Sequence, residues 1–322
     1  MTAKIFIDGE VGTTGLQIRN RLEGRTDIHL LHLPESRRKD TNARAEMLNS
    51  ADLAILCLPD DAAREAVALI TNPGVKVIDA STAHRVADGW VYGFPELDAD
   101  QAGRIAQAKR VANPGCYALA SIAMLHPLIT AGLLPADTPV TLNAISGYSG
   151  GGRKMIESFE DPNAPDYTET PFRVYGLTLA HKHVPEIQVY AGLGKRPLFM
   201  PSVGHFARGM IVQLPLQLWA LPGTPAPADL HAALKTHYAG RPFVQVSDLA
   251  ASSALTGIEP ELLNGTDMLR LHVFGNETEG QAVVMALIDN LGKGAAGQAV
   301  HNLNLMCGVP ETSGLVTGAP AG

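Results

Sequence analysis

The chain has 322 residues, of which 46% are hydrophobic and 18% are charged, and its formal net charge is −7. Single hydrophobic cores stop growing at about 250–300 residues, so this length predicts two domains. The negative charge argues against a nucleic acid or an anionic membrane surface as the partner, and a small-molecule substrate is expected instead.

The cellular setting is indicated by features that the sequence lacks. Three cysteines are too few for a disulfide framework, and none of them forms a CxxC pair. No apolar run approaches the roughly 20 residues that cross a bilayer, and the apolar run at 5–7 is too short for the core of a signal peptide. We therefore expect a cytoplasmic protein with reduced thiols and no membrane contact.

The first 115 residues alternate between short apolar strands and helices. The predicted strand at 52–58 is continuously apolar from Leu53 to Leu58 and ends before Pro59, which is typical of a strand buried on both faces of a parallel sheet. This alternation predicts the α/β class, with a Rossmann-like, doubly wound parallel sheet in a domain of residues 1–115. Strands are expected at 4–8, 28–33, 52–58, 75–79 and 110–112, and helices at 16–22, 43–49 and 61–70.

A different pattern follows Cys116 and predicts an α+β domain over residues 116–288, with a larger, partly antiparallel sheet for catalysis and oligomerisation. Gly, Pro and polar residues crowd 146–171 and 192–205, so long loops are expected there. The tail from Pro310 is expected to fray. A helix is expected at 117–129, strands at 139–144, 209–216 and 268–274, a strand or helix at 281–289, and a helix of small residues after 294.

A glycine-rich turn follows the first predicted strand and opens the first predicted helix. The glycines have GxxGxxG spacing rather than the more usual GxGxxG. Glycine lets the backbone turn tightly and approach a pyrophosphate, which binds at the positive end of the helix. We therefore predict a dinucleotide site there, with an ordinary glycine-rich turn as the alternative. Its residues are Gly9, Gly12, Thr13, Thr14 and Gly15.

The end of the second predicted strand indicates which dinucleotide is bound. An acidic residue at this point holds the ribose 2′-hydroxyl of NAD, whereas arginine accommodates the 2′-phosphate of NADP. Ser36, Arg37 and Arg38 therefore favour NADP(H). Two alternatives remain: Glu35 as the ribose ligand of an NAD enzyme, and a solvated charged loop.

Cys116 is the candidate nucleophile, because its neighbours are turn residues rather than core residues. Pro114 and Gly115 make a turn before it, and a helix is expected to start at once. The positive end of a helix dipole lowers the pKa of a thiol and favours the reactive thiolate. Cys57 lies inside an apolar strand and Cys307 near a helix end, so both are expected to be structural.

Two histidines supply candidates for the acid or base that such covalent catalysis needs. His181 and His183 stand two residues apart, before Pro185 and Glu186. In an extended segment these histidines would point to opposite faces, so only one needs to reach the thiol. Zinc is the rival use of an HxH pair, but no third ligand stands out and we expect no metal. His205 is the second candidate.

A second glycine-rich stretch runs from Ser146 to Arg153 and includes Gly150. Its backbone N–H groups could bind an anion, with Arg153 adding positive charge. We predict contact with the nicotinamide side of the cofactor or with a leaving phosphate. A flexible hairpin loop is the alternative.

Taken together, these segments resemble the shorter form of the N-acetyl-γ-glutamyl-phosphate reductases, which share a two-domain fold with aspartate-semialdehyde dehydrogenase. The Asn-Pro-Gly-Cys-Tyr and His-x-His-x-Pro-Glu-Ile motifs are specific, and the glycine motifs are not. The similar segments are Gly9-x-x-Gly12-x-x-Gly15, Asp79-Ala-Ser-Thr-Ala-His-Arg85, Tyr92-Gly-Phe-Pro-Glu96, Asn113-Pro-Gly-Cys-Tyr117, Ser146-Gly-Tyr-Ser-Gly-Gly-Gly-Arg153, His181-Lys-His-Val-Pro-Glu-Ile187 and the stretch from Asp289 to Val300.

The resemblance implies an arginine-biosynthesis enzyme that reduces N-acetyl-γ-glutamyl phosphate with NADPH through a cysteine thioester. It implies that Cys116 is the nucleophile and that His181 is preferred over His183. It also places Ser81 by the cofactor, and a segment at about 289–310 that returns to the cofactor domain, with Asn290 near the nicotinamide. Further candidate site residues are Asn113, Glu186, Arg153, Gly150 and His205.

Three other functions remain open at this point. Aspartate-semialdehyde dehydrogenase, or a related acyl-phosphate reductase, would use the same chemistry on another substrate. A Cys-His acyltransferase or hydrolase would use no nicotinamide, which the glycine turn and Arg37 and Arg38 argue against. A non-catalytic NADP-binding sensor would not need Cys116. The large second sheet makes a homodimer or homotetramer the expected assembly.

Overall fold

A computed structural model describes residues 2–318 of the chain, which form two compact units. The first unit contains the residues up to Pro95 together with Ala99–Gly115 and Ala295–Leu315. The second unit contains Glu96–Asp98, Cys116–Gly294 and the residues from Val316. No helix within residues 2–318 combines the length and the apolar character that a membrane span requires.

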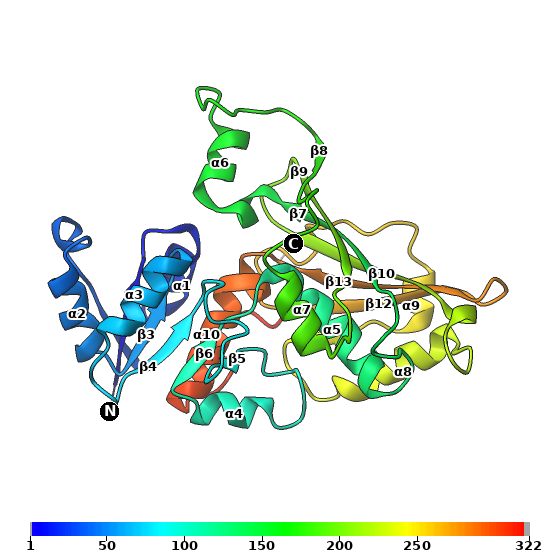
Figure 1. Cartoon of the computed structure of the whole chain (residues 1–322), viewed down its shortest axis with the longest axis horizontal. Coiled ribbons are helices and arrows are strands. Elements are labelled where there is room, and N and C mark those ends of the chain that lie inside the picture. The colour runs from blue at the N-terminus through cyan, green and yellow to red at the C-terminus, as the bar shows by residue number, and fades with distance from the viewer. Residues whose placement is uncertain (1, 319–322) are drawn as a thin grey trace. The chain divides into compact units, whose positions relative to one another are not determined.

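The first unit is built on a six-stranded sheet in the order β2-β1-β3-β4-β6-β5, and all of its strand pairs are parallel. This confirms the predicted doubly wound sheet. Figure 1 labels β3, β4, β6 and β5 of this sheet. The strands are β1 (Ala3–Asp8), β2 (Ile28–Leu31), β3 (Leu53–Leu56), β4 (Lys76–Asp79), β5 (Val91–Tyr92) and β6 (Arg110–Ala112), and the helices are α1 (Thr13–Leu22), η1 (Glu35–Arg37), α2 (Thr41–Ser50), α3 (Asp60–Leu69), α4 (Gln101–Gln107) and α10 (Gly297–Cys307).

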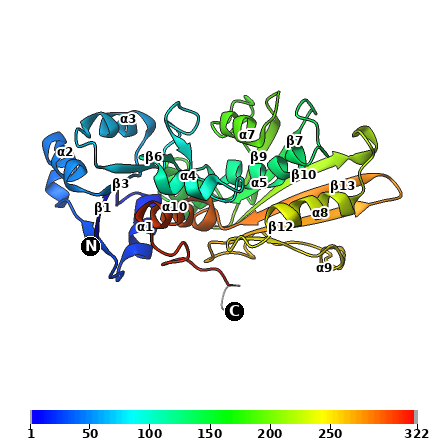
Figure 2. The ribbon, with the colours of Figure 1, turned by 90° about the horizontal axis from the view of Figure 1, so that it is seen from below.

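Alternate side chains of each strand pack into two separate cores. In β1, Ile5 and Ile7 pack with α1, α4 and α10, while Phe6 packs with α2 and α3 on the other face. Figure 2 shows α10 beside α1 and α4, although almost 190 residues separate α4 from α10. Because both faces are covered, the strands are apolar on both sides, which is why 53–58 is a continuous apolar run.

The segment after α10 is held by side chains rather than frayed. The Nδ2 group of Asn304 donates hydrogen bonds to the carbonyl oxygens of Glu311 and Ser313, both at 2.9 Å. The expectation of fraying from Pro310 is therefore wrong for this part of the tail. Residues 319–322 lie outside the described part of the chain.

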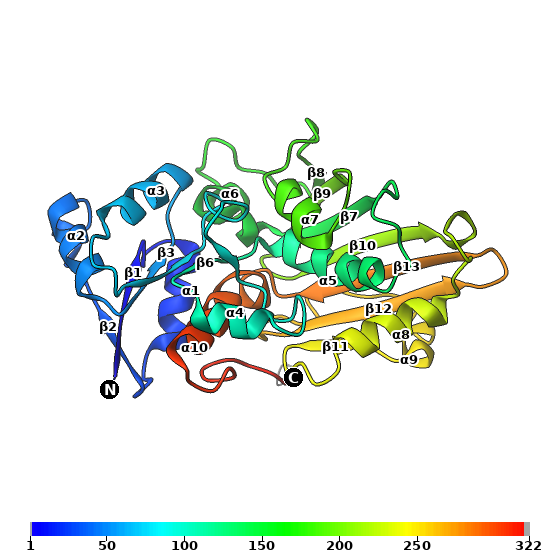
Figure 3. The ribbon, with the colours of Figure 1, turned by 60° about the horizontal axis from the view of Figure 1, so that its bottom comes forward.

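The second unit contains a mixed seven-stranded sheet in the order β11-β12-β13-β10-β7-β9-β8, as predicted for an α+β domain (Figure 3). The segment 281–289, which the sequence left open, is a strand. The strands are β7 (Thr141–Gly147), β8 (Phe172–Val174), β9 (Leu198–Gly204), β10 (Met210–Gln217), β11 (Val244–Val246), β12 (Leu269–Asn276) and β13 (Gln281–Ile288). The helices are α5 (Cys116–Thr130), η2 (Tyr148–Gly151), α6 (Gly152–Glu160), α7 (Val184–Ala191), η3 (Leu218–Ala220), α8 (Pro227–His237) and α9 (Leu249–Ser253). The π-helical turn η4 (Gly292–Ala296) begins in this unit, which includes it up to Gly294.

Helices cover one face of this second sheet. Helix α5 packs on β10 and β13, with α7 and α8 beside it. Its residues from Tyr117 to Leu125 are all buried, so α5 is apolar on every side. The opposite face carries a row of half-exposed side chains that lie in register across β13, β10, β7 and β9. They are Met285, Gln213, Asn143 and Met200.

Two stretches that were expected to be long loops are largely regular structure. Helix α6 follows the glycine-rich stretch, and β9 lies between β7 and β8. Glycine and Pro201 obscured both elements, because each is unfavourable in a regular element. Strand β9 tolerates Pro201, whose carbonyl oxygen still accepts a hydrogen bond from the Tyr175 backbone N–H. The prediction of a loop at 192–205 is therefore wrong from Leu198 onward.

A buried ion pair holds the short segment Glu96–Asp98 against the rest of the second unit. The Nζ atom of Lys293 lies 2.6 Å from Oε1 of Glu96, and both side chains are only 1% exposed. Lys293 also stands over the ring of Phe243, at 5.1 Å from its centroid. Two charges removed from water stabilise the fold only while they stay paired.

We expect Lys293→Met to lower the free energy of unfolding by about 3–5 kcal/mol, because it leaves the Glu96 carboxylate buried without its counter-charge. Adding Glu96→Gln should restore most of the loss. Denaturant titration measures both, and Lys235→Met, which breaks the exposed pair with Asp248, is the matched control. A loss for Lys293→Met no larger than the control's would contradict this.

Candidate active site

The carboxyl ends of β1, β2 and β3 border a cavity of about 420 Å³ in the first unit. The order of strands reverses at this edge, between β1 and β3, which is where doubly wound sheets bind their ligands. Gly9 lines the cavity with φ +90°, and a Cβ there would lie 2.3 Å from the carbonyl oxygen of Cys57. Only glycine fits this position.

The rest of the glycine turn forms the start of α1. Gly12 is the N-cap residue and donates to the carbonyl oxygen of Gly9 at 3.0 Å. Thr13 and Thr14 open the helix, so their backbone N–H groups are among the first-turn donors. A Cβ on Gly15 would lie 2.3 Å from the Gly9 oxygen. The residues present therefore fit a dinucleotide pyrophosphate.

The basic residues after β2 separate into two groups. Arg38 and Lys39 line the cavity, whereas Ser36 and Arg37 are exposed on η1 and are not part of its lining. Arg37 instead lies 3.6 Å from Asp40. Of the three residues predicted for the 2′-phosphate, the structure thus brings only Arg38 to the cavity and adds Lys39.

Acidic side chains that the sequence analysis missed hold the basic ones in place. Glu10, within the glycine turn, lies 3.3 Å from Nη2 of Arg38 and 3.1 Å from Nδ1 of His32. Arg44 of α2 donates to Asp8 at 2.9 Å, and both are buried in the cavity wall. No sequence signal marked Arg44, since a lone arginine in a helix is usually on a solvated face.

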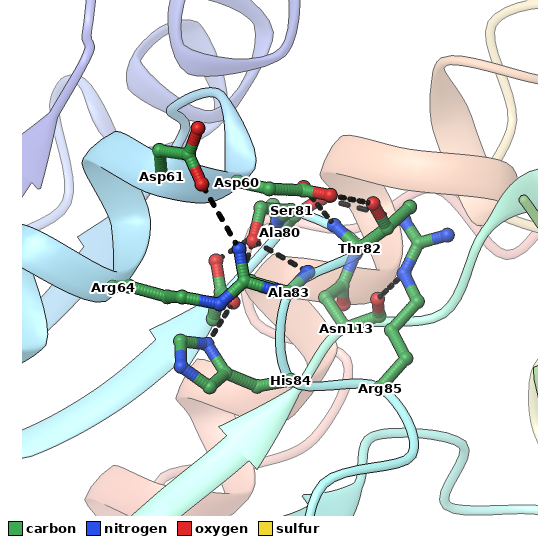
Figure 4. A network of polar contacts seen from close by, with 11 residues as sticks. Asp60, Asp61, Arg64, Ala80, Ser81, Thr82, Ala83, His84, Arg85 and Asn113 are labelled. Carbon is green, nitrogen blue, oxygen red and sulfur yellow. Dashed lines mark hydrogen bonds and ion pairs between the residues drawn. The ribbon is translucent and has the colours of Figure 1, made fainter.

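Ser81 lies at the carboxyl end of β4, in the loop that runs on to Arg85 (Figure 4). The fully buried Asp79 carboxylate accepts hydrogen bonds from the Ser81 backbone N–H at 2.9 Å and from its hydroxyl at 2.7 Å. It also lies 2.6 Å from Nδ1 of His84, whose ring stacks on Trp90. These contacts fix the Ser81 loop at the ligand-binding edge of the first sheet.

The side chain of Asn113 is hydrogen-bonded within its own unit. Its Nδ2 group donates to the carbonyl oxygen of Ala295 at 3.1 Å, and its Oδ1 accepts from Asn302 at 3.0 Å. Its backbone oxygen accepts from Nε of Arg85, as Figure 4 shows. The side chain is almost completely buried, and these bonds make Asn113 a structural residue at the end of β6.

Cys116 is the first residue of α5 and is partly exposed. Two tyrosines lie near its thiol. Tyr175 donates its hydroxyl to that of Tyr117 at 3.1 Å, and Tyr117 donates to the carbonyl oxygen of Ser202 at 3.2 Å. Burial raises the pKa of Tyr175 to about 12, and burial with the charges of Tyr175 and Cys116 raises the pKa of Tyr117 well above its usual range. Both hydroxyls therefore stay protonated, so neither tyrosine is a base.

His181 and His183 face each other, and the prediction that they point to opposite sides is wrong. Their ring centroids are 4.7 Å apart, and both rings contact Tyr117, at 5.7 and 5.9 Å. The segment is a turn rather than a strand, because Val184 N–H bonds to the His181 carbonyl oxygen and α7 begins there, with Pro185 in its first turn.

Exposure and hydrogen bonding distinguish the two histidines. His183 is buried, whereas His181 is only partly buried. The His183 backbone N–H donates to Nδ1 of His181 at 3.2 Å. In the neutral imidazole this places the proton on Nε2. His181 is therefore accessible and, when neutral, presents its Nε2–H group as a hydrogen-bond donor.

The remaining candidates have other surroundings. Glu186 is buried in the first turn of α7. The burial of Tyr190, together with the negative charge of Glu186, raises the pKa of Tyr190 to about 12. His205 is exposed and its ring packs edge-on against Phe159. Arg153 is an exposed residue of α6 that bonds to Glu157. The last two show no contact that links them to the Cys116 neighbourhood.

Asn290 joins the glycine-rich stretch to the end of β13. Its Oδ1 accepts from the Gly209 backbone N–H at 2.8 Å, and its Nδ2 donates to Oγ of Ser149 at 3.0 Å. A Cβ on Gly150 would lie 3.3 Å from the same Nδ2 atom. Asn290 therefore fixes the Ser149–Gly150 backbone. Among residues 2–318, no cluster of three His, Cys, Asp or Glu side chains could hold a metal ion.

Known proteins resemble the chain over nearly its whole length. A profile described as semialdehyde dehydrogenase, NAD binding domain, matches residues 4–105, and one described as semialdehyde dehydrogenase, dimerisation domain, matches residues 116–290. The N-acetyl-gamma-glutamyl-phosphate reductase of Chelativorans sp. (strain BNC1) is 59% identical over 95% of this chain and 98% of its own. The chain belongs to the N-acetyl-gamma-glutamyl-phosphate reductase family. It is therefore an oxidoreductase with a nicotinamide-dinucleotide domain.

Other relatives support this family assignment. The protein of Pseudomonas putida named N-acetyl-gamma-glutamyl-phosphate reductase 2 is 56% identical over 97% of this chain and 99% of its own. Among solved structures, aspartate semialdehyde dehydrogenase from Francisella tularensis has a TM-score of 0.71 at 15% identity, covering 95% of this chain and 100% of its own. The Vibrio cholerae aspartate semialdehyde dehydrogenase II complexed with ASA has a TM-score of 0.69 at 14% identity, covering 95% and 98%. At such identities these two structures show that this reductase-family member shares their fold.

Proposed function

We propose that the chain reduces N-acetyl-γ-glutamyl phosphate to N-acetylglutamate 5-semialdehyde, with release of phosphate, as a step of arginine biosynthesis. The observation that carries the proposal is that Cys116, the first residue of α5, and the partly exposed His181 both lie beside Tyr117 and Tyr175. The relatives that share this sequence over nearly their full length carry the name of that reductase.

The cofactor is NADPH, held by the first unit. The amides that open α1 and the bare backbone of Gly9 and Gly15 would hold its pyrophosphate, and Arg38 and Lys39 would bind its 2′-phosphate. When bound, NADPH supplies the hydride that reduces the enzyme-bound acyl group. Ser81, Gly150 and Asn290 are proposed to lie by the cofactor, their loops held by the bonds described above.

The chemistry begins at Cys116. Its thiolate attacks the acyl carbon, the bond from carbon to the phosphate oxygen breaks, and phosphate leaves with that electron pair. The positive end of α5 favours the thiolate at this position. After reduction, the thiohemiacetal oxygen takes a proton from Nε2 of His181 in its imidazolium form, which leaves the imidazole neutral. The oxygen returns that proton as the carbon–sulfur bond breaks, which releases the aldehyde and the thiolate.

The reverse reaction tests this function directly. The purified enzyme, incubated with N-acetylglutamate semialdehyde, NADP and phosphate, should form NADPH, and omission of phosphate should stop the reaction. Aspartate semialdehyde is the comparison substrate. If only that compound supports phosphate-dependent reduction of NADP, the enzyme is an aspartate-semialdehyde dehydrogenase and the substrate assignment is wrong.

The cavity geometry predicts which basic residues select NADPH. Arg38→Ala with Lys39→Ala should weaken NADPH binding by about 1.5–3 kcal/mol, or 10- to 150-fold, because charge-assisted hydrogen bonds to the 2′-phosphate are lost. NADH binding should change much less. Fluorescence titration with both cofactors measures this, and Arg37→Ala, outside the cavity lining, is the matched control. Equal losses for NADPH and NADH would remove the assignment.

The assembly is a homodimer or homotetramer in the cytoplasm, where reducing conditions keep the Cys116 thiol free. The face of the second sheet opposite α5 supports this. Helix α9 and the segment around Ile258 and Leu263 pack on part of it, but its half-exposed row includes Met285 and Met200 and borders cavities of about 340 and 300 Å³. A second copy of the chain is the occupant expected for such a face. The profile that matches the second unit is described as a dimerisation domain.

Met285→Asp should therefore convert the assembly into smaller species, because it places a charge in an apolar interface. Light scattering coupled to gel filtration gives the molar mass. Val189→Asp puts the same charge on an exposed position of α7, in the helical layer, and should leave the mass unchanged. An unchanged mass for the folded Met285→Asp variant would place the interface elsewhere.

A further inference from the structure

A single π-helical turn, η4 (Gly292–Ala296), stands directly after β13. π-Helical turns are rare and are often found at functional sites. The Gly294 backbone N–H donates to the carbonyl oxygen of Asp289, five residues earlier, at 3.0 Å. The turn therefore has a defined geometry, and its glycines lie against other parts of the second unit.

Gly294 lies against the base of the Cys116 side chain. A Cβ on Gly294 would lie 2.9 Å from Cβ of Cys116, 3.1 Å from the Asp289 carbonyl oxygen and 3.1 Å from Cδ1 of Ile288. The φ angle of Gly294 is outside the left-handed region, so its backbone conformation is open to any residue. Glycine is required here for space alone.

The crowded atom on Cys116 is the one that cannot move independently. A Cβ is fixed to the backbone, so it can give way only if the first turn of α5 shifts with it. On the other side, the turn is held by Gly292, where a Cβ would lie 2.2 Å from the Thr266 carbonyl oxygen, and by the buried pair of Lys293 with Glu96. Neither partner can retreat easily.

We infer that Gly294 is a positioning residue for the nucleophile: its missing side chain sets where the Cα–Cβ bond of Cys116 points. This inference rests on the proposed role of Cys116. The role of Gly294 does not follow from the role of Cys116, because a reactive thiol at a helix start does not by itself require glycine at a position 178 residues later in the chain. The turn would thus join two distant segments at the reacting atom.

Gly294→Ala tests the inference. Displacement of a reacting group by about 1 Å can cost about 10²-fold in rate, so we expect kcat to fall at least tenfold. The KM for the acyl phosphate and the affinity for NADPH should change by less than about threefold. The rate at which iodoacetamide alkylates Cys116, followed against pH, should also change, and a purely structural loss would not alter it in folded protein. Gly103→Ala, on α4 with open space around it, is the matched control.

A second variant separates crowding at Cys116 from crowding at Ile288. Adding Ile288→Val removes Cδ1 and makes room on that side only. We expect the double variant to regain thermal stability but to keep the low kcat and the altered alkylation. It also carries the test if Gly294→Ala alone does not fold. Recovery of both stability and wild-type kcat would overturn the inference. If Cys116→Ala itself stays active, the proposed function fails instead.

Discussion

Cys116→Ala should abolish turnover, with kcat reduced by about 10⁴-fold or more, because no thioester can form without the nucleophile. NADPH binding should survive, since the cavity that we assign to the dinucleotide is lined by residues of the first unit alone. The two measurements are a steady-state assay with N-acetyl-γ-glutamyl phosphate and a fluorescence titration with NADPH. A folded variant with a near-normal rate would exclude a thioester on Cys116.

The other two cysteines provide internal controls for this experiment. Burial raises the pKa of Cys57 to about 12, with the charges of Asp79 and Asp8 adding to it. Burial also raises the pKa of Cys307. Neither is a thiolate near neutral pH, so Cys57→Ala and Cys307→Ala should retain the wild-type kcat. Alkylation of the wild-type enzyme should likewise label Cys116 first.

The first unit was predictable because its information is local. Apolar runs such as 53–58 mark strands that are covered on both faces, and the glycine turn marks the junction from β1 to α1. Its helices follow the strands in sequence, apart from α10, so short-range patterns determine most of its elements. The position of Cys116 at a helix start was predictable for the same reason.

The active-site geometry was less predictable because it depends on tertiary contacts. The spacing of His181 and His183 suggested an extended segment, but Pro185 in the first turn of α7 makes it a turn with both rings on Tyr117. A period of two residues could not distinguish these cases. Likewise, nothing near Gly294 in the sequence indicates that Cys116 packs on it.

The cofactor cavity shows that basic residues that are neighbours in the sequence do not all reach the same site in the structure. Arg37 and Arg38 are neighbours in the chain, yet only Arg38 lines the cavity, because η1 turns Arg37 toward Asp40. Arg44 comes from α2, a predicted helix in which no pattern marked this arginine as a cavity residue, and it forms a buried pair with Asp8. A run of basic residues therefore indicates the ligand's charge but not which side chain meets it.

His181→Asn should lower kcat by about 10²–10⁴-fold, the usual contribution of a general acid or base. Asparagine is the informative replacement, because its Oδ1 can still accept the His183 backbone N–H that now bonds to Nδ1. The turn before α7 should persist, so the proton on Nε2 is what the variant loses. The limb of the pH–rate profile that belongs to the imidazole should vanish with it.

Two matched variants decide whether His181 carries that proton. His205→Asn changes an exposed ring that packs on Phe159 and should keep nearly the wild-type kcat. His183→Asn removes a buried ring beside Tyr117, so it should lower thermal stability more than His181→Asn does. If the imidazole limb of the profile survived in His181→Asn and vanished in His183→Asn, the proton would belong to His183. The partly exposed ring would then only orient the buried one.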